Sequence, residues 1–138
     1  MSPTRWIRQA AAIPIRDGQI CLVTSSTGRR WIIPKGMMEP DKSTAEIALQ
    51  ESWEEAGLVG SLRTESLGSY FYEKYGGTCH VTVYLLHVTA VHDDWPEAAL
   101  RKRAWFTPED ALTMVRDPGL NELMEQVFQA ERLLLATV

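Results

Sequence analysis

The sequence predicts an α+β fold, in which a mixed β-sheet is sandwiched between helices (α/β/α). Strand-like apolar runs bounded by turn residues fill the first half, and one helical segment interrupts them. A second helical region closes the chain, so strands and helices do not alternate regularly. A chain of 138 residues without repeats or linkers fits one domain with its own core. We therefore expect a single domain over residues 1–138.

The first elements are two strands, expected at residues 9–15 and 19–25 and joined by the turn Arg16-Asp17-Gly18. An Asp-Gly pair between two apolar runs is typical of a β-hairpin. A short strand at residues 31–33 precedes Pro34, and residues 35–42 are expected to form a loop.

A helix is expected over residues 43–56. Ser43 or Thr44 can cap its start, and Glu46 is placed to close a capping box on Ser43. Gly57 is typical of the residue that ends a helix in the left-handed conformation. On a helical wheel, four residues share the side that we expect to face the core: Ala45, Leu49, Trp53 and Ala56.

The remaining elements are two long strands, expected at residues 61–72 and 79–91, and a short strand at residues 104–106. A helix then starts at Pro108, with Thr107 as its N-cap. A last helix is expected from Asp117-Pro118 to about residue 135. Its predicted buried stripe consists of Leu120, Leu123, Met124, Val127, Phe128 and Leu134.

Composition narrows the class of partner. A formal net charge of −4 argues against a general nucleic-acid binder, but a local basic pocket for a phosphorylated small molecule remains compatible with it. Cys21 and Cys79 lie in strand-like runs and are expected to be buried free thiols. No signal-peptide core or membrane span is visible, so we expect a cytoplasmic protein without membrane contact, as a monomer or homodimer.

Glu51, Glu54 and Glu55 gather on the helix side opposite the expected core face. No Lys or Arg lies within residues 43–60 to offset them, whereas a solvated helix face usually mixes both signs of charge. Oxygen-rich clusters of this kind suit Mg²⁺ or Mn²⁺, which couple carboxylates to substrate phosphates. The spacing alone leaves both a solvated acidic face and a metal site open.

The segment around these glutamates resembles the signature of the Nudix hydrolase family. That signature runs Gly, five residues, Glu, seven residues, Arg-Glu, an aliphatic residue, one residue, Glu-Glu, one residue, Gly and an aliphatic residue. Gly36 opens it here, the three glutamates take their places, and Gly57 and Leu58 close it. The chain departs from it at Lys42, Gln50 and Ser52, where the first Glu, the Arg and the aliphatic residue are expected.

The resemblance covers nearly the whole chain. The stretches RRWIIPKGMMEP and DDWPEAALRKRAWF resemble the diphosphoinositol and diadenosine polyphosphate phosphohydrolases of this family, in a bacterial subgroup with a substituted signature. Two compensations for the substitutions remain open: Lys42 supplies the missing positive charge, and Glu39 replaces the missing acid.

The resemblance implies a single Nudix hydrolase domain that cleaves a pyrophosphate bond in a nucleoside diphosphate derivative. The foremost substrates are a dinucleoside polyphosphate or an inositol pyrophosphate. Glu51, Glu54 and Glu55 would be the catalytic residues and would hold Mg²⁺ or Mn²⁺, together with a backbone carbonyl at Lys35 or Gly36. The residues implied in substrate binding are Ser25, Arg30, Lys35, Lys42 and Arg101. The alternative is a module with weak or no catalysis that binds a phosphorylated ligand as a sensor, which the changes at Lys42 and Gln50 motivate.

Overall fold

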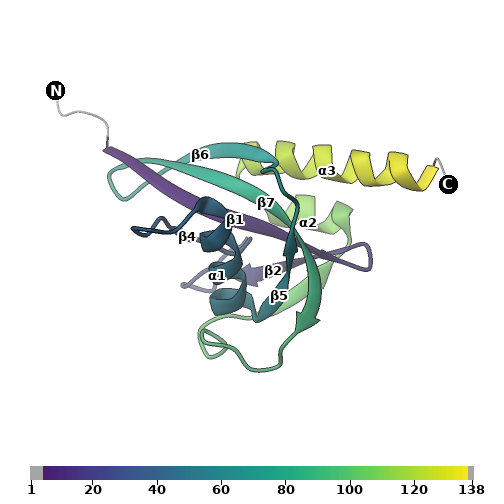
Figure 1. The fold of residues 1–138 in the computed structure, drawn as a ribbon, viewed down its shortest axis with the longest axis horizontal. Coiled ribbons are helices and arrows are strands. Elements are labelled where there is room, and N and C mark those ends of the chain that lie inside the picture. The colour runs from purple at the N-terminus through teal and green to yellow at the C-terminus, as the bar shows by residue number, and fades with distance from the viewer. Residues whose placement is uncertain (1–4, 137–138) are drawn as a thin grey trace.

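The computed structural model describes residues 5–136, with side chains described as far as residue 130. An eight-stranded mixed sheet has α1 on one face and α2 and α3 on the other, which confirms the α+β prediction (Figure 1). The helices are α1 (Thr44–Ala56), α2 (Pro108–Met114) and α3 (Pro118–Ala136). The strands are β1 (Arg5–Arg16), β2 (Gln19–Thr24), β3 (Trp31–Ile32), β4 (Lys35–Met37), β5 (Leu58–Leu62), β6 (Gly68–Lys74), β7 (Gly77–Val91) and β8 (Arg103–Phe106).

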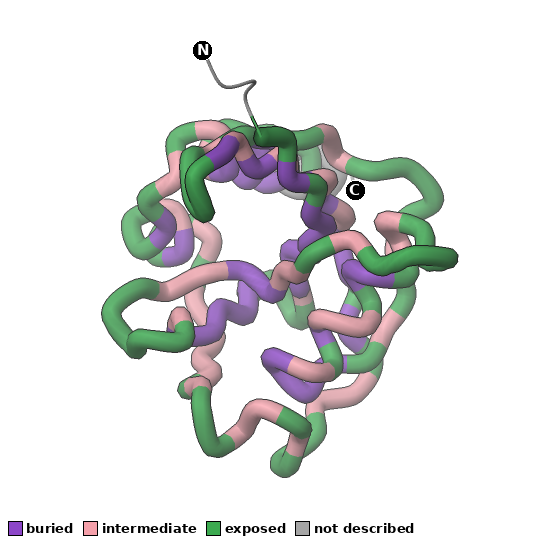
Figure 2. Tube along the Cα trace, turned by 90° about the vertical axis from the view of Figure 1, so that its left-hand side faces the viewer, coloured by how far each residue is buried: buried purple, intermediate pink, exposed green. Residues whose placement is uncertain are grey.

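The centre of the sheet is a parallel pair formed by β1 and β7. Their register runs from Arg5 opposite Gly77 to Ile15 opposite His87. Successive β1 residues point to opposite faces, so Ala11 packs in the core beneath α3 and Ala12 in the core beneath α1. Burial follows this arrangement: buried segments gather in the interior strands, and the connecting loops are mostly exposed (Figure 2).

The β1–β2 hairpin confirms the predicted turn. Arg16 pairs with Gln19, and the two residues between them, Asp17 and Gly18, have φ angles of 51° and 75°. Two left-handed residues in succession match the right-handed twist of the flanking strands, which explains the choice of Asp-Gly.

Two strand predictions need correction. Residues 61–72 form no single strand, because β5 and β6 pair with different parts of β7: Leu58 lies opposite Val91, and Lys74 lies opposite Gly77. The loop expected after Pro34 contains β4, which pairs with β1 and puts Gly36 opposite Ala10. Both features depend on long-range pairing that local sequence does not encode.

Helix α1 begins and ends as predicted. The Ser43 hydroxyl accepts the Glu46 N–H, the Glu46 carboxylate accepts the Ser43 N–H, and Gly57 adopts φ 68°.

The predicted core face of α1 is right at Ala56, which is buried, but wrong at Leu49 and Trp53, which are 39% and 37% exposed. Trp53 instead packs edge-on against His92, with ring centroids 5.0 Å apart. Ser52 is buried and satisfies its hydroxyl by donating to the Ala48 carbonyl at 2.7 Å. The buried residues of the helix are Ile47, Ala48, Ser52, Glu55 and Ala56. The helix is therefore rotated from the expected orientation, and the rotation turns Glu55 inward.

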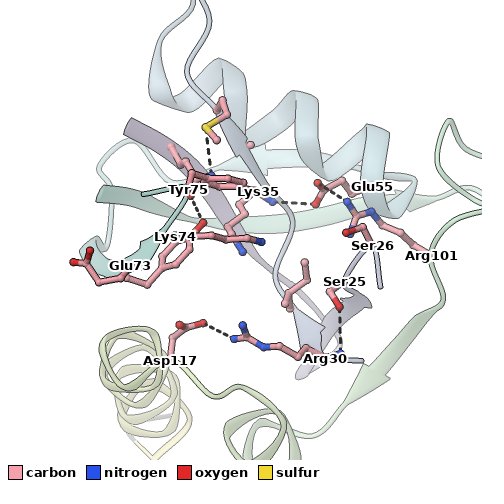
Figure 3. Close-up of a pocket in the computed structure, with 15 residues that line it drawn as sticks. Ser25, Ser26, Arg30, Lys35, Glu55, Glu73, Lys74, Tyr75, Arg101 and Asp117 are labelled. Atoms are coloured by element: carbon pink, nitrogen blue, oxygen red, sulfur yellow. Dashed lines mark hydrogen bonds and ion pairs between the residues drawn. The ribbon is translucent and has the colours of Figure 1, made fainter. Parts of the chain in front are cut away.

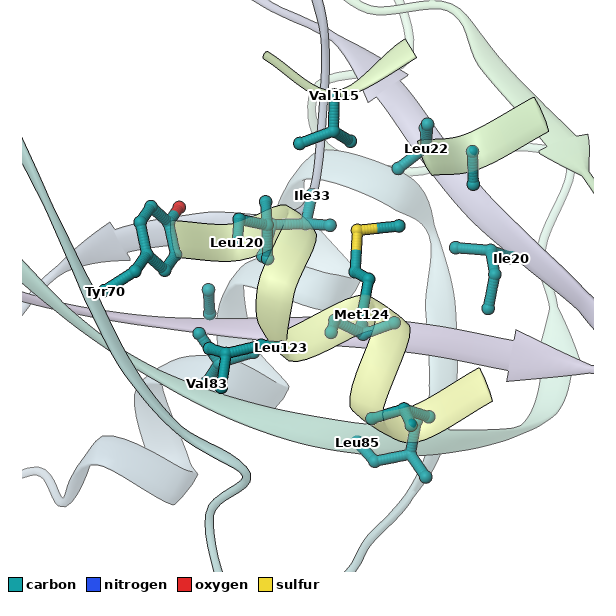
Figure 4. Packing of buried hydrophobic residues seen from close by; sticks show 14 of the residues in the cluster. Ile20, Leu22, Ile33, Tyr70, Val83, Leu85, Val115, Leu120, Leu123 and Met124 are labelled. Atoms are coloured by element: carbon teal, nitrogen blue, oxygen red, sulfur yellow. The ribbon is translucent and has the colours of Figure 1, made fainter. Parts of the chain in front are cut away.

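Helices α2 and α3 close the second face. Thr107 caps α2 as predicted, and its hydroxyl accepts the Asp110 N–H at 3.2 Å. The predicted α3 stripe is buried at Leu120, Leu123, Met124, Val127 and Phe128. Figure 4 shows the first three of these side chains in the core. The Leu134 side chain lies outside the described residues.

Cys21 and Cys79 are buried free thiols, as predicted, and burial raises the pKa of Cys21 to about 12. Within residues 5–136 no helix is long and apolar enough to cross a bilayer.

Met124 offers a direct test of the α3 core. It is fully buried, whereas Met114 on α2 is 39% exposed. We expect Met124→Ala to lower the free energy of unfolding by about 2–5 kcal/mol, because it leaves a cavity. Met114→Ala should lower the free energy of unfolding by less than about 1 kcal/mol. Urea unfolding of both variants measures this, and equal losses would contradict the described packing.

Candidate active site

The loop between β7 and β8 is attached to the end of α1. The last carbonyls of a helix have no partner within the helix, and the last turn of α1 has no basic residue to satisfy them. Donors from the loop and from the start of β8 bind these carbonyls instead. Within the loop, the N–H groups of His92 and Glu97 donate to the Gly57 and Glu54 carbonyls at 2.9 and 3.0 Å. The Trp95 indole donates to Glu55 O at 3.0 Å, and the Arg103 guanidinium donates to Ala56 O at 2.8 Å. The Arg103 guanidinium also stacks 4.3 Å from the centre of the Trp95 ring. The loop therefore has a fixed position beside the glutamates of α1.

This attachment brings a fourth glutamate to the site. Carboxylate oxygens of Glu51, Glu54 and Glu97 lie within 4.8 Å of one another. Sequence analysis missed Glu97. Its position four residues before Arg101, after the Asp-Trp pair, is the signal available in the sequence.

Glu51 has the electrostatics expected of a ligand to a cation. Its pKa is raised to about 7, first by burial and then by the neighbouring carboxylates of Glu55, Glu54 and Glu97. A divalent cation would relieve both effects, and three carboxylates suit a hard metal ion. The glycine at position 36 leaves room for this side chain, since a Cβ there would lie 2.3 Å from the Glu51 Oε1 atom. The donor set and the space therefore fit a divalent metal.

Glu55 is in a different environment from Glu51 and Glu54. It is buried, its Oε1 atom accepts the Lys35 N–H at 3.1 Å, and its Oε2 atom accepts from Arg101 at 3.2 Å. Burial raises its pKa to about 7, although Arg101 and the Lys35 N–H act in the opposite direction. The Arg101 guanidinium also donates to Glu97 at 3.0 Å and to the Thr24 carbonyl at 2.9 Å. Arg101 thus connects the carboxylates of the helix and of the loop.

A cavity of about 270 Å³ opens beside Glu55 (Figure 3). The structure brings six of the sequence-predicted residues to its wall: Ser25, Arg30, Lys35, Gly36, Glu55 and Arg101. The cavity wall also contains residues that sequence analysis did not assign to the site: Gln9, Ser26, Ile32, Met37, Tyr72, Glu73, Lys74, Tyr75 and Asp117. They come from β1, the β2–β3 loop, β3, β4, β6 with the turn after it, and the residue before α3, segments that local patterns do not bring together.

Lys42 does not line this cavity. It donates a short hydrogen bond to the side-chain carbonyl of Gln50, whose amide donates to Glu39 at 2.5 Å. Lys42 also lies 3.7 Å from Glu39. Two of the three substituted positions of the signature, Lys42 and Gln50, therefore contact each other and Glu39. Glu39 contributes to the raised pKa of Glu51, so its charge acts on the acidic cluster.

A family model for the NUDIX domain matches residues 6–128. The chain belongs to this family. The match spans the sheet, α1, α2 and most of α3, and includes the acidic cluster and the cavity.

Curated relatives support the same family. Diphosphoinositol polyphosphate phosphohydrolase 3-beta from Bos taurus is 39% identical over 105 residues, which are 73% of this chain and 62% of that protein. Nudix hydrolase 16, mitochondrial, from Arabidopsis thaliana is 32% identical over 118 residues, which are 80% of this chain and 65% of that protein. The chain thus spans less than two thirds of the length of these relatives.

Solved structures show the same fold. The E. coli ORF135 protein has a TM-score of 0.67 at 27% identity, over 94% of this chain and 92% of that one. A C. elegans Ap4A hydrolase has a TM-score of 0.72 at 20% identity, over 94% of this chain and 99% of that one.

The close approach at Gly36 gives the first prediction for the site. The Cβ of Gly36→Ala would displace the Glu51 carboxylate, because the two would overlap. We expect Mn²⁺ affinity to fall about ten-fold or more. The free energy of unfolding should change by about 1 kcal/mol or less, since the Glu51 side chain can move away. Mn²⁺ titration and urea unfolding measure the two quantities, and unchanged affinity would contradict the role of the glycine.

The raised pKa of Glu51 gives a second prediction for the site, which concerns stability and pH. The folded protein binds this proton more tightly than the unfolded chain, whose glutamate titrates near 4.5. Stability is therefore lost as the pH rises from 4.5 to about 7, and is constant above that range. Without metal at pH 8, Glu51→Gln should raise the melting temperature by a few degrees.

Excess Mg²⁺ should reverse this order, because it stabilises the parent protein more than the variant. Glu65→Gln on the exposed loop after β5 is the control and should melt like the parent. Glu51→Gln melting below the parent without metal would refute the proposed repulsion.

Proposed function

We propose that this chain is a divalent-metal-dependent hydrolase that cleaves a phosphoanhydride bond in a nucleoside diphosphate derivative, foremost a dinucleoside polyphosphate. The observation that carries the proposal is the acidic cluster of Glu51, Glu54 and Glu97 beside a cavity with basic residues in its wall. Metal ligands next to cationic side chains suit a phosphate chain, because the metal and the cations share its negative charge. The names of the relatives, which include phosphohydrolases of diphosphoinositol polyphosphates, support the reaction class.

The proposed roles divide the carboxylates into two groups. Glu51, Glu54 and Glu97 would hold the metal, with Glu97 in the role first expected of Glu55. A backbone carbonyl at Lys35 or Gly36 would complete its ligands. A bound divalent ion supplies polarisation of the phosphoryl oxygens and a more acidic water molecule. Glu55 would hold the site together through Arg101 and the Lys35 N–H, and it can take up a proton because its pKa is about 7.

The cavity would bind the rest of the substrate. Lys35 lies in its wall with its ammonium 5.3 Å from the centre of the Tyr72 ring, and the Tyr72 hydroxyl donates to Gln9 at 2.6 Å. Lys35 would bind phosphate, and Tyr72 together with the exposed Tyr75 offers aromatic surface to a nucleobase. Ser25 would add a hydrogen bond to the phosphates. Arg30 and Arg101 are already paired with Asp117 and Glu55, so they would offer only their remaining N–H donors. Lys42 would act outside the cavity, on Gln50 and Glu39, in place of direct substrate binding.

Several finer expectations remain predictions. They are the use of Mg²⁺ or Mn²⁺, one Nudix hydrolase domain over residues 1–138, a monomer or homodimer, no nucleic-acid partner and a cytoplasmic location. The net charge of −4 supports the absence of a general nucleic-acid partner. An inositol pyrophosphate is the second substrate candidate.

Turnover tests the proposal. Diadenosine polyphosphates, inositol pyrophosphate, ADP-ribose and nucleoside triphosphates are each incubated with Mg²⁺ or Mn²⁺, and product release is measured. We expect the diadenosine polyphosphate to give the highest kcat/KM. Glu55→Gln should reduce it by roughly 100-fold or more, because an amide cannot accept both hydrogen bonds or take up the proton. Glu65→Gln on the exposed loop should leave it unchanged.

The sensor alternative predicts a different result. Metal-dependent binding of these ligands without turnover of any of them would overturn the enzyme proposal. It would mean that the substitutions at Lys42 and Gln50 accompany a loss of catalysis.

A further inference from the structure

An ion pair in the cavity wall joins two segments that are distant in sequence. Arg30 lies just before β3 and Asp117 just before α3, and the guanidinium lies 3.3 Å from the Asp117 carboxylate (Figure 3). Both residues line the cavity, and their side chains are 43% and 22% exposed. The proposed reaction does not use Asp117, so its carboxylate in a phosphate-binding cavity needs another explanation.

The charges in the cavity largely cancel. Its wall contains the cations Arg30, Lys35, Lys74 and Arg101 and the anions Glu55, Glu73 and Asp117. Arg101 is paired with Glu55 and Glu97, and Arg30 with Asp117. Among the described side chains, Lys35 and Lys74 form no ion pair, which leaves two cations available to a ligand.

Asp117 also lies in the same cavity wall as one of these two cations, Lys35. A phosphate bound by Lys35 would therefore share the cavity with a carboxylate of like charge.

The two candidate substrate classes differ in how many cationic side chains are needed to neutralise their phosphates. A dinucleoside polyphosphate carries its charge on one linear chain, which a metal and a few cations can neutralise, and it ends in aromatic bases. An inositol polyphosphate carries phosphates around a whole ring, and each phosphate left without a partner in the cavity costs desolvation. A fixed carboxylate in the wall penalises the second ligand more than the first.

We propose that Asp117 is a specificity-determining residue, whose carboxylate neutralises Arg30 and disfavours densely phosphorylated ligands relative to linear nucleoside polyphosphates. This inference rests on the proposed function, because it assigns the cavity to the substrate of that reaction. It selects the nucleotide substrates over the inositol pyrophosphates by charge.

The Asp117→Asn variant isolates this charge from any structural role. The backbone carbonyl of Asp117 accepts the Asn121 N–H at 3.0 Å at the start of α3, and a change of side chain leaves that bond in place. Asparagine has nearly the same shape as aspartate and is also tolerated at helix starts. The control is Asp110→Asn near the start of α2, which makes the same chemical change away from the cavity.

The experiment measures the affinity for inositol hexakisphosphate and for diadenosine tetraphosphate by calorimetry, with divalent ions chelated so that no turnover occurs. Asp117→Asn should strengthen the binding of inositol hexakisphosphate about ten-fold, since a like charge several ångströms away is removed. The affinity for diadenosine tetraphosphate should rise less than about three-fold. Asp110→Asn should change neither affinity.

A second variant tests whether Asp117 acts through Arg30. Arg30→Gln should weaken the binding of inositol hexakisphosphate by less than about three-fold in the parent, where Arg30 is already neutralised. In the Asp117→Asn background, Arg30→Gln should lower the affinity for inositol hexakisphosphate about ten-fold, because the freed guanidinium then binds phosphate. Additive effects of the two substitutions would overturn this part of the inference.

Other outcomes also contradict the inference. If Asp117→Asn raised the affinity for both ligands equally, Asp117 would not discriminate between them. If it lowered both affinities, Asp117 would instead orient Arg30 for binding. Inositol hexakisphosphate has no phosphoanhydride bond, so these affinities stand whether or not the chain hydrolyses any substrate. Failure of the proposed function would appear separately, as absence of turnover with metal present.

Discussion

The attachment of the β7–β8 loop to the carbonyl end of α1 is the constraint on which the site depends. A helix that ends without basic residues needs donors from elsewhere, and this loop supplies them from backbone, indole and guanidinium groups. The same hydrogen bonds that satisfy the helix fix Glu97 beside Glu54 and bring Arg101 to Glu55. The hydrogen bonds that satisfy the helix carbonyls therefore also place the clustered carboxylates.

Much of the fold follows from local chemistry that the sequence displays. The capping box at Ser43 and Glu46, the left-handed Gly57 and the Asp17-Gly18 hairpin were all predictable, because each is set by a few neighbouring residues. The buried face of α1 was not. Hydrophobicity favoured the side with Trp53, but packing against the sheet buried a serine and a glutamate that find hydrogen-bond partners inside. Pairing of β4 with β1 likewise depends on tertiary contacts.

The candidate site was predictable where a residue belongs to the signature and less so elsewhere. Glu51, Glu54, Glu55 and Gly36 could be named from spacing and resemblance, although the environments that distinguish Glu55 from Glu51 could not. Glu97 joins the cluster only through the fold of its loop. The aromatic and acidic residues of the cavity wall come from three separate segments, α1, residues 72–75 and the residue before α3, and no local pattern relates these segments.

The parallel pairing of β1 with β7 affects how the chain can acquire its structure. Residues 5–15 pair along one edge with residues 77–87, so this edge of β1 stays open until residues 77–87 have been synthesised. Pairings of such high contact order form slowly. Until then the apolar N-terminal segment has an unsatisfied edge, which can pair with other chains. Chaperone binding during synthesis would therefore be directed to this segment.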